Sequence, residues 1–273
     1  MNDFITKTPT PTKMEKISVV LNTYNAEQHL REVLESVRDF DEIVVCDMES
    51  TDRTREIARE YGAKIVIFPK GNHKICEPAR DTAIHSASND WVLVVDADEK
   101  VPPALREYLY EKVNSGFEGA MAVPRLNQFL SRPAHGSPDY QLRFFRQSRA
   151  TWPPVIHARP VTDTPVVNIP AKKHRLSLIH LDNPSLASRY DKLNRYSDYE
   201  VPRREKRKFG TLMFLLKPFW AFISVWLIRG AWKDGRRGLI NAYNAMIYKT
   251  MLMSKVTEKQ LNDLEIKKRT ENE

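Results

Sequence analysis

The sequence predicts an α/β domain built on a mostly parallel sheet, followed by a helical region that associates with a membrane. Four apolar segments carry this prediction, because they have the length of strands and lack the polar alternation of half-exposed strands. They read ISVVL at 17–21, EIVVCD at 42–47, AKIVIF at 63–68 and WVLVV at 91–95. Amphipathic segments separate them, and strands that alternate with helices in this way form parallel sheets covered on both faces.

The segments between these strands have helical patterns and helix boundaries. Between the first two strands, the apolar residues at helical spacing are Leu30, Val33, Leu34 and Val37. The next helix is expected to take Ser50 or Thr51 as its N-cap and to end at Gly62. Further helices are expected at 78–88 and at 102–113, where two prolines open the segment.

The pattern changes in the second half of the chain. Residues 119–180 are rich in proline, arginine and aromatic residues, which predicts shorter, more exposed strands joined by loops. From Asn183 onward the pattern is helical. The predicted parts are a disordered leader, the α/β domain, the helical region and a charged tail, at 1–15, 16–182, 183–258 and 259–273. The leader has no apolar core of signal-peptide length.

The net charge and its distribution favour an anionic partner. The formal net charge is +8, which suits nucleic acid, anionic lipid or a phosphorylated substrate. The basic run RREKRK at 203–208 directly precedes the longest apolar segment, so it indicates an anionic membrane surface and no nucleic acid. Two cysteines, Cys46 and Cys76, make no disulfide framework and are typical of a chain in a reducing compartment.

Polar residues follow the predicted strands at the points where the strands end. They are Asn22, Thr23 and Asn25 after the first strand, Asp47 after the second, and Asp96 and Asp98 after the fourth. Such positions converge beyond the carboxyl ends of parallel strands, where ligands bind. Residues two apart in a strand point to the same side, so Asp96 and Asp98 predict a paired carboxylate site for Mg²⁺ or Mn²⁺. The alternative is a solvated loop that merely follows the strand.

Several stretches resemble the family 2 glycosyltransferases in order and spacing. They are ISVVLNTYNAEQHLREVLESV, DEIVVCDMESTDRTREIAREYGAKI, PARDTAIHSASNDWVLVVDADE and PDYQLRFFR. With LIHLDNPSLASRYDKLNRYS and the hydrophobic tail, residues 16–250 look like the branch that adds sugars to lipopolysaccharide core. The resemblance implies a Rossmann-like nucleotide-sugar-binding domain of the GT-A type. It also implies inverting transfer from a nucleotide-diphospho-sugar, with a UDP-sugar favoured, to a lipid-linked glycan or lipopolysaccharide-core acceptor.

The same resemblance implies roles for individual residues. Thr23, Asn25 and Glu27 fall in the first loop, which meets the nucleotide in this family. Asp47 falls where a carboxylate reads the uracil ring, and Arg80 occupies the basic position near the diphosphate.

The pair Asp96 and Asp98 matches the D-x-D motif of the family, with Asp98 as the direct metal ligand. His180 ends another short strand and is a further candidate for the metal, or alternatively a structural histidine. Two positions depart from the family pattern. Glu49 stands where the family usually has glycine, which predicts a differently shaped second loop, and Ala158 stands where many inverting relatives have an acid.

Because Ala158 carries no carboxylate, the general base has to come from another residue. The candidate catalytic residues are Asp139, just before the strand YQLRFFR, and His157. Asp139 is alternatively a turn residue within GSPDY, and His157 is alternatively a hydrogen-bonded structural histidine.

The segment FGTLMFLLKPFWAFISVWLI at 209–228 approaches the length of a transmembrane span. Lys217 and Pro218 in its middle disfavour a lone span. The basic run before it, its tryptophans and the following KDGRRG favour an interfacial helix or shallow hairpin. We therefore expect attachment to the cytoplasmic face of the inner membrane. The alternative is a helical cap on the α/β domain.

Two other functions compete with glycosyl transfer. A sugar nucleotidyltransferase also uses acids and a metal on an α/β sheet, but it requires a glycine-rich phosphate loop where this chain has NTYNAE. A non-catalytic basic adaptor for membrane or nucleic acid would explain the basic tail but leave the strand-end acids without a role. The sequence carries no signal for an oligomeric state.

Overall fold

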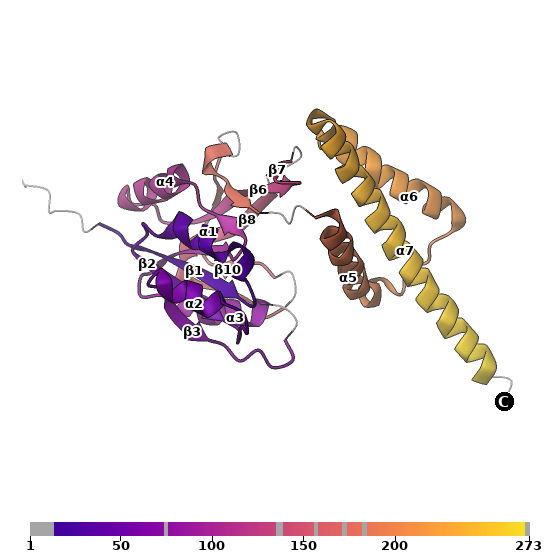
Figure 1. Cartoon of the computed structure of the whole chain (residues 1–273), viewed down its shortest axis with the longest axis horizontal. Helices are drawn as coiled ribbons and strands as arrows, with labels where there is room; N and C mark the ends of the chain where they lie inside the picture. The colour runs from indigo at the N-terminus through magenta and orange to yellow at the C-terminus, as the bar shows by residue number, and fades with distance from the viewer. Residues whose placement is uncertain are drawn as a thin grey trace, which may run out of the picture. The chain divides into compact units, whose positions relative to one another are not determined.

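The structure is a computed structural model of the chain, drawn in Figure 1. It describes residues 14–73, 76–134, 139–155, 158–170, 174–181 and 185–270. The chain forms two compact units. The first comprises Met1–Leu126 and Pro138–Leu181, and the second comprises Asn127–Ser137 and Asp182–Glu273.

A mixed, mostly parallel sheet forms the centre of the first unit, with the strand order β3-β2-β1-β4-β8-β6-β12-β5. The parallel half consists of β3 (Lys64–Ile67), β2 (Glu42–Asp47), β1 (Ile17–Thr23) and β4 (Trp91–Asp96). The other half consists of β8 (Asp139–Arg146), β6 (Ala120–Phe129), β12 (Leu178–His180) and β5 (Glu99–Lys100). The α/β prediction is confirmed, because the four predicted strands are the four parallel strands.

Short strands border the sheet in the part of the chain where they were predicted. They are β7 (Arg132–Pro133) and β11 (Val166–Asn168), which pair with β6, and β9 (Ala150–Thr151) and β10 (Val161–Thr162), which pair with each other. β8 runs antiparallel to both β4 and β6. An antiparallel strand thus lies directly beside β4, whose end carries the acidic motif.

Helices cover both faces of the parallel half. They are α1 (Glu27–Val37), α2 (Thr54–Glu60), α3 (Glu77–His85) and α4 (Pro103–Asn114). In β1, Val19 and Leu21 pack in the cluster that includes α1, α2 and α4, whereas Val20 packs with α3 on the opposite face. All three side chains are fully buried, and burial of each contributes about 1.5–3 kcal/mol to folding.

The start of α2 differs from the prediction, whereas its end agrees with it. The helix begins at Thr54, and neither Ser50 nor Thr51 caps it, because the Ser50 hydroxyl donates to Asp47 instead. Gly62 follows the helix with a φ of 68°, a left-handed conformation that glycine adopts without a steric penalty.

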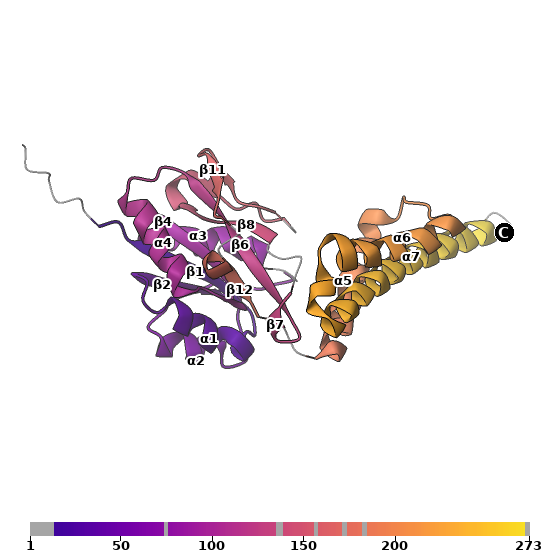
Figure 2. The ribbon, with the colours of Figure 1, turned by 90° about the horizontal axis from the view of Figure 1, so that it is seen from above.

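The second unit is helical, as predicted from Asn183 onward. Its helices are α5 (Leu186–Arg204), α6 (Thr211–Ile223), the π-turn Ser224–Ile228, the 3₁₀ turn Ala231–Asp234 and α7 (Arg236–Thr270). Both α5 and α6 pack against the long helix α7 (Figure 2).

Helix α6 leaves most of its large apolar side chains in solvent. The exposed ones include Leu212, Leu215, Leu216, Phe219 and Trp220. Among the described residues, Thr211–Ile228 is one segment of 18 residues that is long and apolar enough to cross a membrane, judged by length and composition alone. An exposed apolar surface of this extent indicates an interaction site.

Candidate active site

The ends of three parallel strands meet at one edge of the sheet. The strand register places Thr23 opposite Asp47, and Asn22 opposite Asp96. The Thr23 hydroxyl donates to Asp47 Oδ2 at 2.9 Å, which joins the first two strand ends directly. The predicted convergence of polar residues at this edge is therefore present.

Asn25 and Glu27 bind the loop after β1 to the loop after β2. The backbone N–H of Thr51 donates to Asn25 Oδ1 at 2.8 Å, and that of Arg53 donates to Glu27 Oε2 at 3.0 Å. In return, the Glu27 N–H donates to Asp52 Oδ2 at 3.1 Å. These reciprocal bonds hold the two loops in one arrangement, so the predicted nucleotide contacts lie on a preorganised pair of loops.

Asp47 lies beneath these loops and is fully buried. Its carboxylate accepts hydrogen bonds from the Thr23 hydroxyl, from the Ser50 N–H at 2.9 Å and from the Ser50 hydroxyl. Asp47 therefore fixes the loops in this structure, and a base N–H reaches it only if the Ser50 loop moves. The direct reading of uracil by Asp47 stays a prediction.

Two residues of these loops have left-handed backbones. Asn25 has a φ of 47° and Glu49 a φ of 59°. Glycine is the residue that most readily adopts the left-handed conformation found at Glu49. The Glu49 side chain also accepts a hydrogen bond at Oε2 from the Lys70 N–H, at 3.1 Å. Glu49 thus adds a side-chain contact to a turn that glycine would also form.

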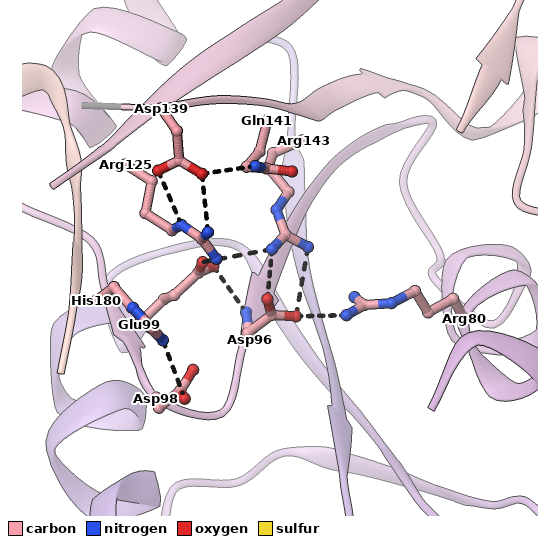
Figure 3. A network of polar contacts seen from close by, with 9 residues as sticks. All are labelled: Arg80, Asp96, Asp98, Glu99, Arg125, Asp139, Gln141, Arg143 and His180. Atoms are coloured by element: carbon pink, nitrogen blue, oxygen red, sulfur yellow. Dashed lines mark hydrogen bonds and ion pairs between the residues drawn. The ribbon is translucent and has the colours of Figure 1, made fainter. Parts of the chain in front are cut away.

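Asp96 ends β4 between two arginines, as Figure 3 shows. Arg80 Nη2 on α3 donates to Asp96 Oδ1 at 2.7 Å, and Arg143 Nη2 on β8 donates to Oδ2. Burial by itself would raise the pKa of Asp96, but the charges of Arg143 and Arg80 outweigh it and hold this pKa well below its ordinary value. Asp96 is therefore a permanent anion at neutral pH.

The expectation that Asp96 and Asp98 point to the same side was wrong. β4 ends at Asp96, and residues 97 and 98 form a turn, so the two-residue period of a strand stops there. Asp96 faces the arginines, whereas Asp98 faces His180 (Figure 3).

Asp98 and His180 form the pair best suited to a metal. His180 Nε2 lies 3.3 Å from Asp98 Oδ2, and the Leu181 N–H donates to the Asp98 carbonyl at 2.7 Å. The side chains of Asp98 and His180 are 40% and 23% exposed, so a cation can reach both. The carboxylate oxygen suits Mn²⁺ or Mg²⁺, and the imidazole nitrogen favours Mn²⁺ of the two. The described ranges contain no group of three His, Cys, Asp or Glu side chains placed to hold a metal. The remaining ligands would therefore be phosphate oxygens of a bound nucleotide and water.

Glu99 extends the ion network beneath this pair. It is fully buried and accepts the Asp96 N–H at 3.0 Å, while Arg143 Nη2 and Arg125 Nη1 lie 3.3 and 3.4 Å from its Oε1. Burial raises the pKa of Glu99, with Asp96 adding to the effect and Arg143 opposing it.

Asp139 closes the network at the first residue of β8. Arg125 donates to it twice, at 3.2 Å from Nε and 2.8 Å from Nη2, and Gln141 Nε2 donates at 2.9 Å. Its side chain is 41% exposed and thus open to an incoming group. The other candidate base, His157, lies outside the described residues, and Ala158 is half-buried.

Two buried polar side chains near the strand ends have atoms without partners among the described residues. Arg80 is 8% exposed, and its Nε and Nη1 have no hydrogen-bond acceptor, although its guanidinium stacks on Trp152 at 4.7 Å. Both amide atoms of Asn22, 8% exposed, are also unsatisfied. Unsatisfied buried groups cost about 1–3 kcal/mol each, and an anionic ligand with several oxygens would satisfy the donors among them, which are Arg80 Nε and Nη1 and Asn22 Nδ2.

Sequence reasoning missed Arg143 and Arg125 as part of the site. The signal for Arg143 was an arginine between Leu142 and Phe144 in a strand otherwise apolar at its centre. An arginine there is buried only with a partner, but the sequence alone does not place β8 beside β4.

The deciding observation is a family match. Residues 18–161, more than half of the chain, match the family model described as glycosyl transferase family 2. The chain belongs to glycosyl transferase family 2. This glycosyltransferase has a GT-A-like fold, with a mixed, mostly parallel sheet and C-terminal helices, and it is a nucleotide-sugar transferase.

Curated relatives resemble the glycosyltransferase over most of its length. An uncharacterized glycosyltransferase of Rickettsia typhi is 25% identical over 262 residues, which cover 91% of this chain and 89% of the relative. The lipopolysaccharide core biosynthesis glycosyltransferase LpsC of Rhizobium meliloti is 24% identical over 255 residues, covering 89% of this chain and 92% of the relative.

Solved structures overlap less closely. Glucosyl-3-phosphoglycerate synthase of Mycobacterium tuberculosis, in complex with Mn²⁺, UDP and glucosyl-3-phosphoglycerate, is 26% identical, with a TM-score of 0.33. The overlap covers 42% of this chain and 44% of that one, so it spans under half of the solved chain. TarS of S. aureus is 15% identical, with a TM-score of 0.48, over 85% of this chain and 90% of the other.

Proposed function

We propose that the glycosyltransferase moves a sugar from a UDP-sugar, with inversion, to a lipid-linked glycan or lipopolysaccharide-core acceptor at a membrane surface. The observation that carries this proposal is the strand-end site itself. There the Asp98–His180 pair lies beside the Arg80–Asp96–Arg143 array, and buried Arg80 keeps two nitrogens without acceptors. Such a site combines a cation-binding pair with a buried donor for a diphosphate.

The protein's own residues have separate tasks in the proposed reaction. Arg80 donates to the diphosphate oxygens, where negative charge grows as the bond to the sugar breaks. Asp96 and Glu99 hold Arg143 and Arg80 in place. Asp98 and His180 would hold a divalent cation, which would supply positive charge to the departing diphosphate. We place Asp96 in the arginine network rather than on the metal.

We propose Asp139 as the general base that takes the proton of the acceptor hydroxyl. Its carboxylate is held by Arg125 and Gln141 and is still 41% exposed, so it is both oriented and accessible. The Asp139→Asn variant is expected to lose about 10²–10⁴-fold in kcat, the usual contribution of a general base. The acidic limb of its pH–rate profile should disappear, which the loss of a merely positioning residue would not cause.

The matched comparison for this prediction is His157→Ala, measured over the same pH range. A fully active Asp139→Asn variant with an unchanged pH profile would remove Asp139 as the base. Loss of the acidic limb in His157→Ala instead would assign the role to His157.

The donor is tested by turnover of sugar nucleotides in the presence of Mn²⁺. We expect release of UDP from a UDP-sugar and at least about tenfold slower release of GDP from the matching GDP-sugar, since the site is proposed to read uracil. Faster turnover of the GDP-sugar would reject the choice of base. Intact donors under all conditions, with a folded protein, would reject the proposed transfer.

We also propose that α6 attaches the enzyme to the cytoplasmic face of the inner membrane. The exposed apolar side chains of α6 and the basic run at 203–208 support this placement, as does the similarity to a lipopolysaccharide core enzyme.

The Leu215→Glu variant, at a side chain 68% exposed, should bind anionic vesicles about tenfold more weakly in co-sedimentation. Val161→Glu, at a side chain 60% exposed in the first unit, is the matched control. Equal binding by both variants would contradict the role of α6.

A further inference from the structure

A cationic cavity lies within the helical second unit. It has a volume of about 480 Å³ and is lined by α5, α6, the π-turn and α7. Its charged lining residues are Arg204, Lys217, Arg229, Lys249 and Glu200. Four cations and one carboxylate therefore line one cavity that is open to solvent.

The carboxylate does not neutralise the cations. Glu200 Oε2 is engaged by Arg204 Nε at 2.6 Å. Among the residues that the structure describes, no carboxylate forms an ion pair with Lys217, Arg229 or Lys249. Burial and the charges of Arg204 and Lys217 lower the pKa of Lys249, which is the response of an ammonium group in a crowded positive site. An anion of more than one charge would compensate this excess of positive charge.

An apolar groove on α6 continues from this cavity. The groove is lined by Leu216, Lys217, Phe219, Trp220 and Ile223. Lys217 and Trp220 belong to both the groove and the cavity. The cationic cavity and the apolar groove are thus two parts of one amphipathic site.

A second cavity, of about 310 Å³, opens beside the first and shares Arg229 and Tyr248 with it. Among its lining residues is Asn244, which is 3% exposed and whose amide nitrogen and oxygen have no partner in the described parts of the chain. A buried, unsatisfied amide calls for a polar ligand, since leaving it unpaired costs free energy. Hydroxyl groups next to a phosphate would satisfy it.

We propose that this amphipathic site binds a phosphorylated lipid, with its phosphate among Lys217, Arg229 and Lys249 and its hydrocarbon chain along α6. A phosphate monoester or diphosphate carries two or more charges, which matches the excess of cations better than the single charge of a phosphodiester. The adjoining groove favours a lipid over free phosphate, because only a lipid fills both parts. The proposal does not depend on sugar transfer, and the site lies wholly in the second unit.

The test uses short-chain lipids below their critical micelle concentration, so that no membrane is needed. Calorimetry on the full chain compares dihexanoyl phosphatidate with dihexanoyl phosphatidylglycerol and with inorganic phosphate. We expect phosphatidate to bind at least about tenfold more tightly than either, through the additional charge and terminal oxygen that the diester lacks and the apolar contacts that free phosphate lacks. Equal affinity for phosphatidate and phosphatidylglycerol would overturn the headgroup assignment, and equal affinity for inorganic phosphate would make the cavity a free-phosphate site.

Variants locate the binding. Lys249→Met and, separately, Arg229→Met should each weaken phosphatidate about tenfold, whereas Lys233→Met, an exposed lysine outside the cavity, should change it less than twofold. Removing Lys249 relieves repulsion in the empty cavity, so this variant should melt no lower than the wild type. An equal loss of phosphatidate affinity in Lys233→Met would show that binding depends only on the net charge of the protein, and would overturn the proposal. Release of UDP from a UDP-sugar, measured in the same variants without lipid, should be unchanged, so a failure here is distinct from a failure of the proposed transfer.

Discussion

Replacing Arg143 with methionine should destabilise the first unit by about 3–5 kcal/mol, the usual result of removing one partner of a buried ion pair. The Arg143 side chain is 5% exposed and contacts both Asp96 and the fully buried Glu99. Methionine fills much of the same volume, so the loss reflects two carboxylates left without their shared cation. Denaturant unfolding at pH 7 measures the difference, with Arg149→Met as the control, because Arg149 makes only an exposed pair with Asp163.

The pH dependence separates lost charge from lost packing. In the wild type, the lowered pKa of Asp96 contributes stability above the ordinary value of 3.8, and this is lost only as pH falls through the lower folded value. In Arg143→Met, the folded pKa values of Asp96 and Glu99 should both rise. Protonation would then favour the folded variant as the pH falls from 7 toward 4.5, the ordinary pKa of Glu99. The difference in unfolding free energy should shrink over that range, whereas a packing defect would leave it constant.

Replacing Asp98 with asparagine should lower turnover of the UDP-sugar by about 10³-fold, since the variant loses the anionic ligand of the proposed metal pair. Asp98 is 40% exposed and makes its side-chain contact with His180, so the fold should survive the change. Mn²⁺ affinity, followed by electron paramagnetic resonance, provides a readout independent of catalysis and should fall in parallel.

Asp163→Asn is the matched control for this experiment. Asp163 is an exposed carboxylate that pairs with Arg149 in the first unit, outside the strand-end site. It should keep both turnover and Mn²⁺ affinity. If Asp98→Asn binds Mn²⁺ as the wild type does, Asp98 does not hold the metal, whatever happens to the rate.

The parallel half of the sheet could be predicted because its physics is local. Both faces of a covered sheet accept apolar side chains, so one largely apolar run indicates each strand. The structure contains β1, β2, β3 and β4 at the runs ISVVL, EIVVCD, AKIVIF and WVLVV. Polar residues that follow buried parallel strands lie at the carboxyl edge of the sheet, so their meeting at that edge could also be predicted.

The arginine network could not be predicted because it depends on long-range pairing. Arg143 reaches Asp96 only because β8 enters the sheet antiparallel to β4, 47 residues away along the chain. No local pattern specifies that neighbour. The same limit explains the error at Asp98, where the turn after β4 ended the strand period on which the prediction rested.

The capping prediction failed for a related reason. Ser50 has the chemistry of an N-cap, but Asp47 and Asn25 both hydrogen-bond its hydroxyl, and Asn25 lies in the loop after β1. Hydrogen bonds between the two loops therefore outweighed the local preference for a cap.

The central claim is that one strand-end site binds a uridine diphosphate and a divalent cation together. The most direct measurement is calorimetric titration of the full chain with UDP, with Mn²⁺ and then with excess chelator. We expect UDP to bind at least about tenfold more tightly with Mn²⁺, and by linkage Mn²⁺ to bind more tightly by the same factor with UDP. Equal UDP affinity in both conditions, or no UDP binding by a folded protein, would contradict it.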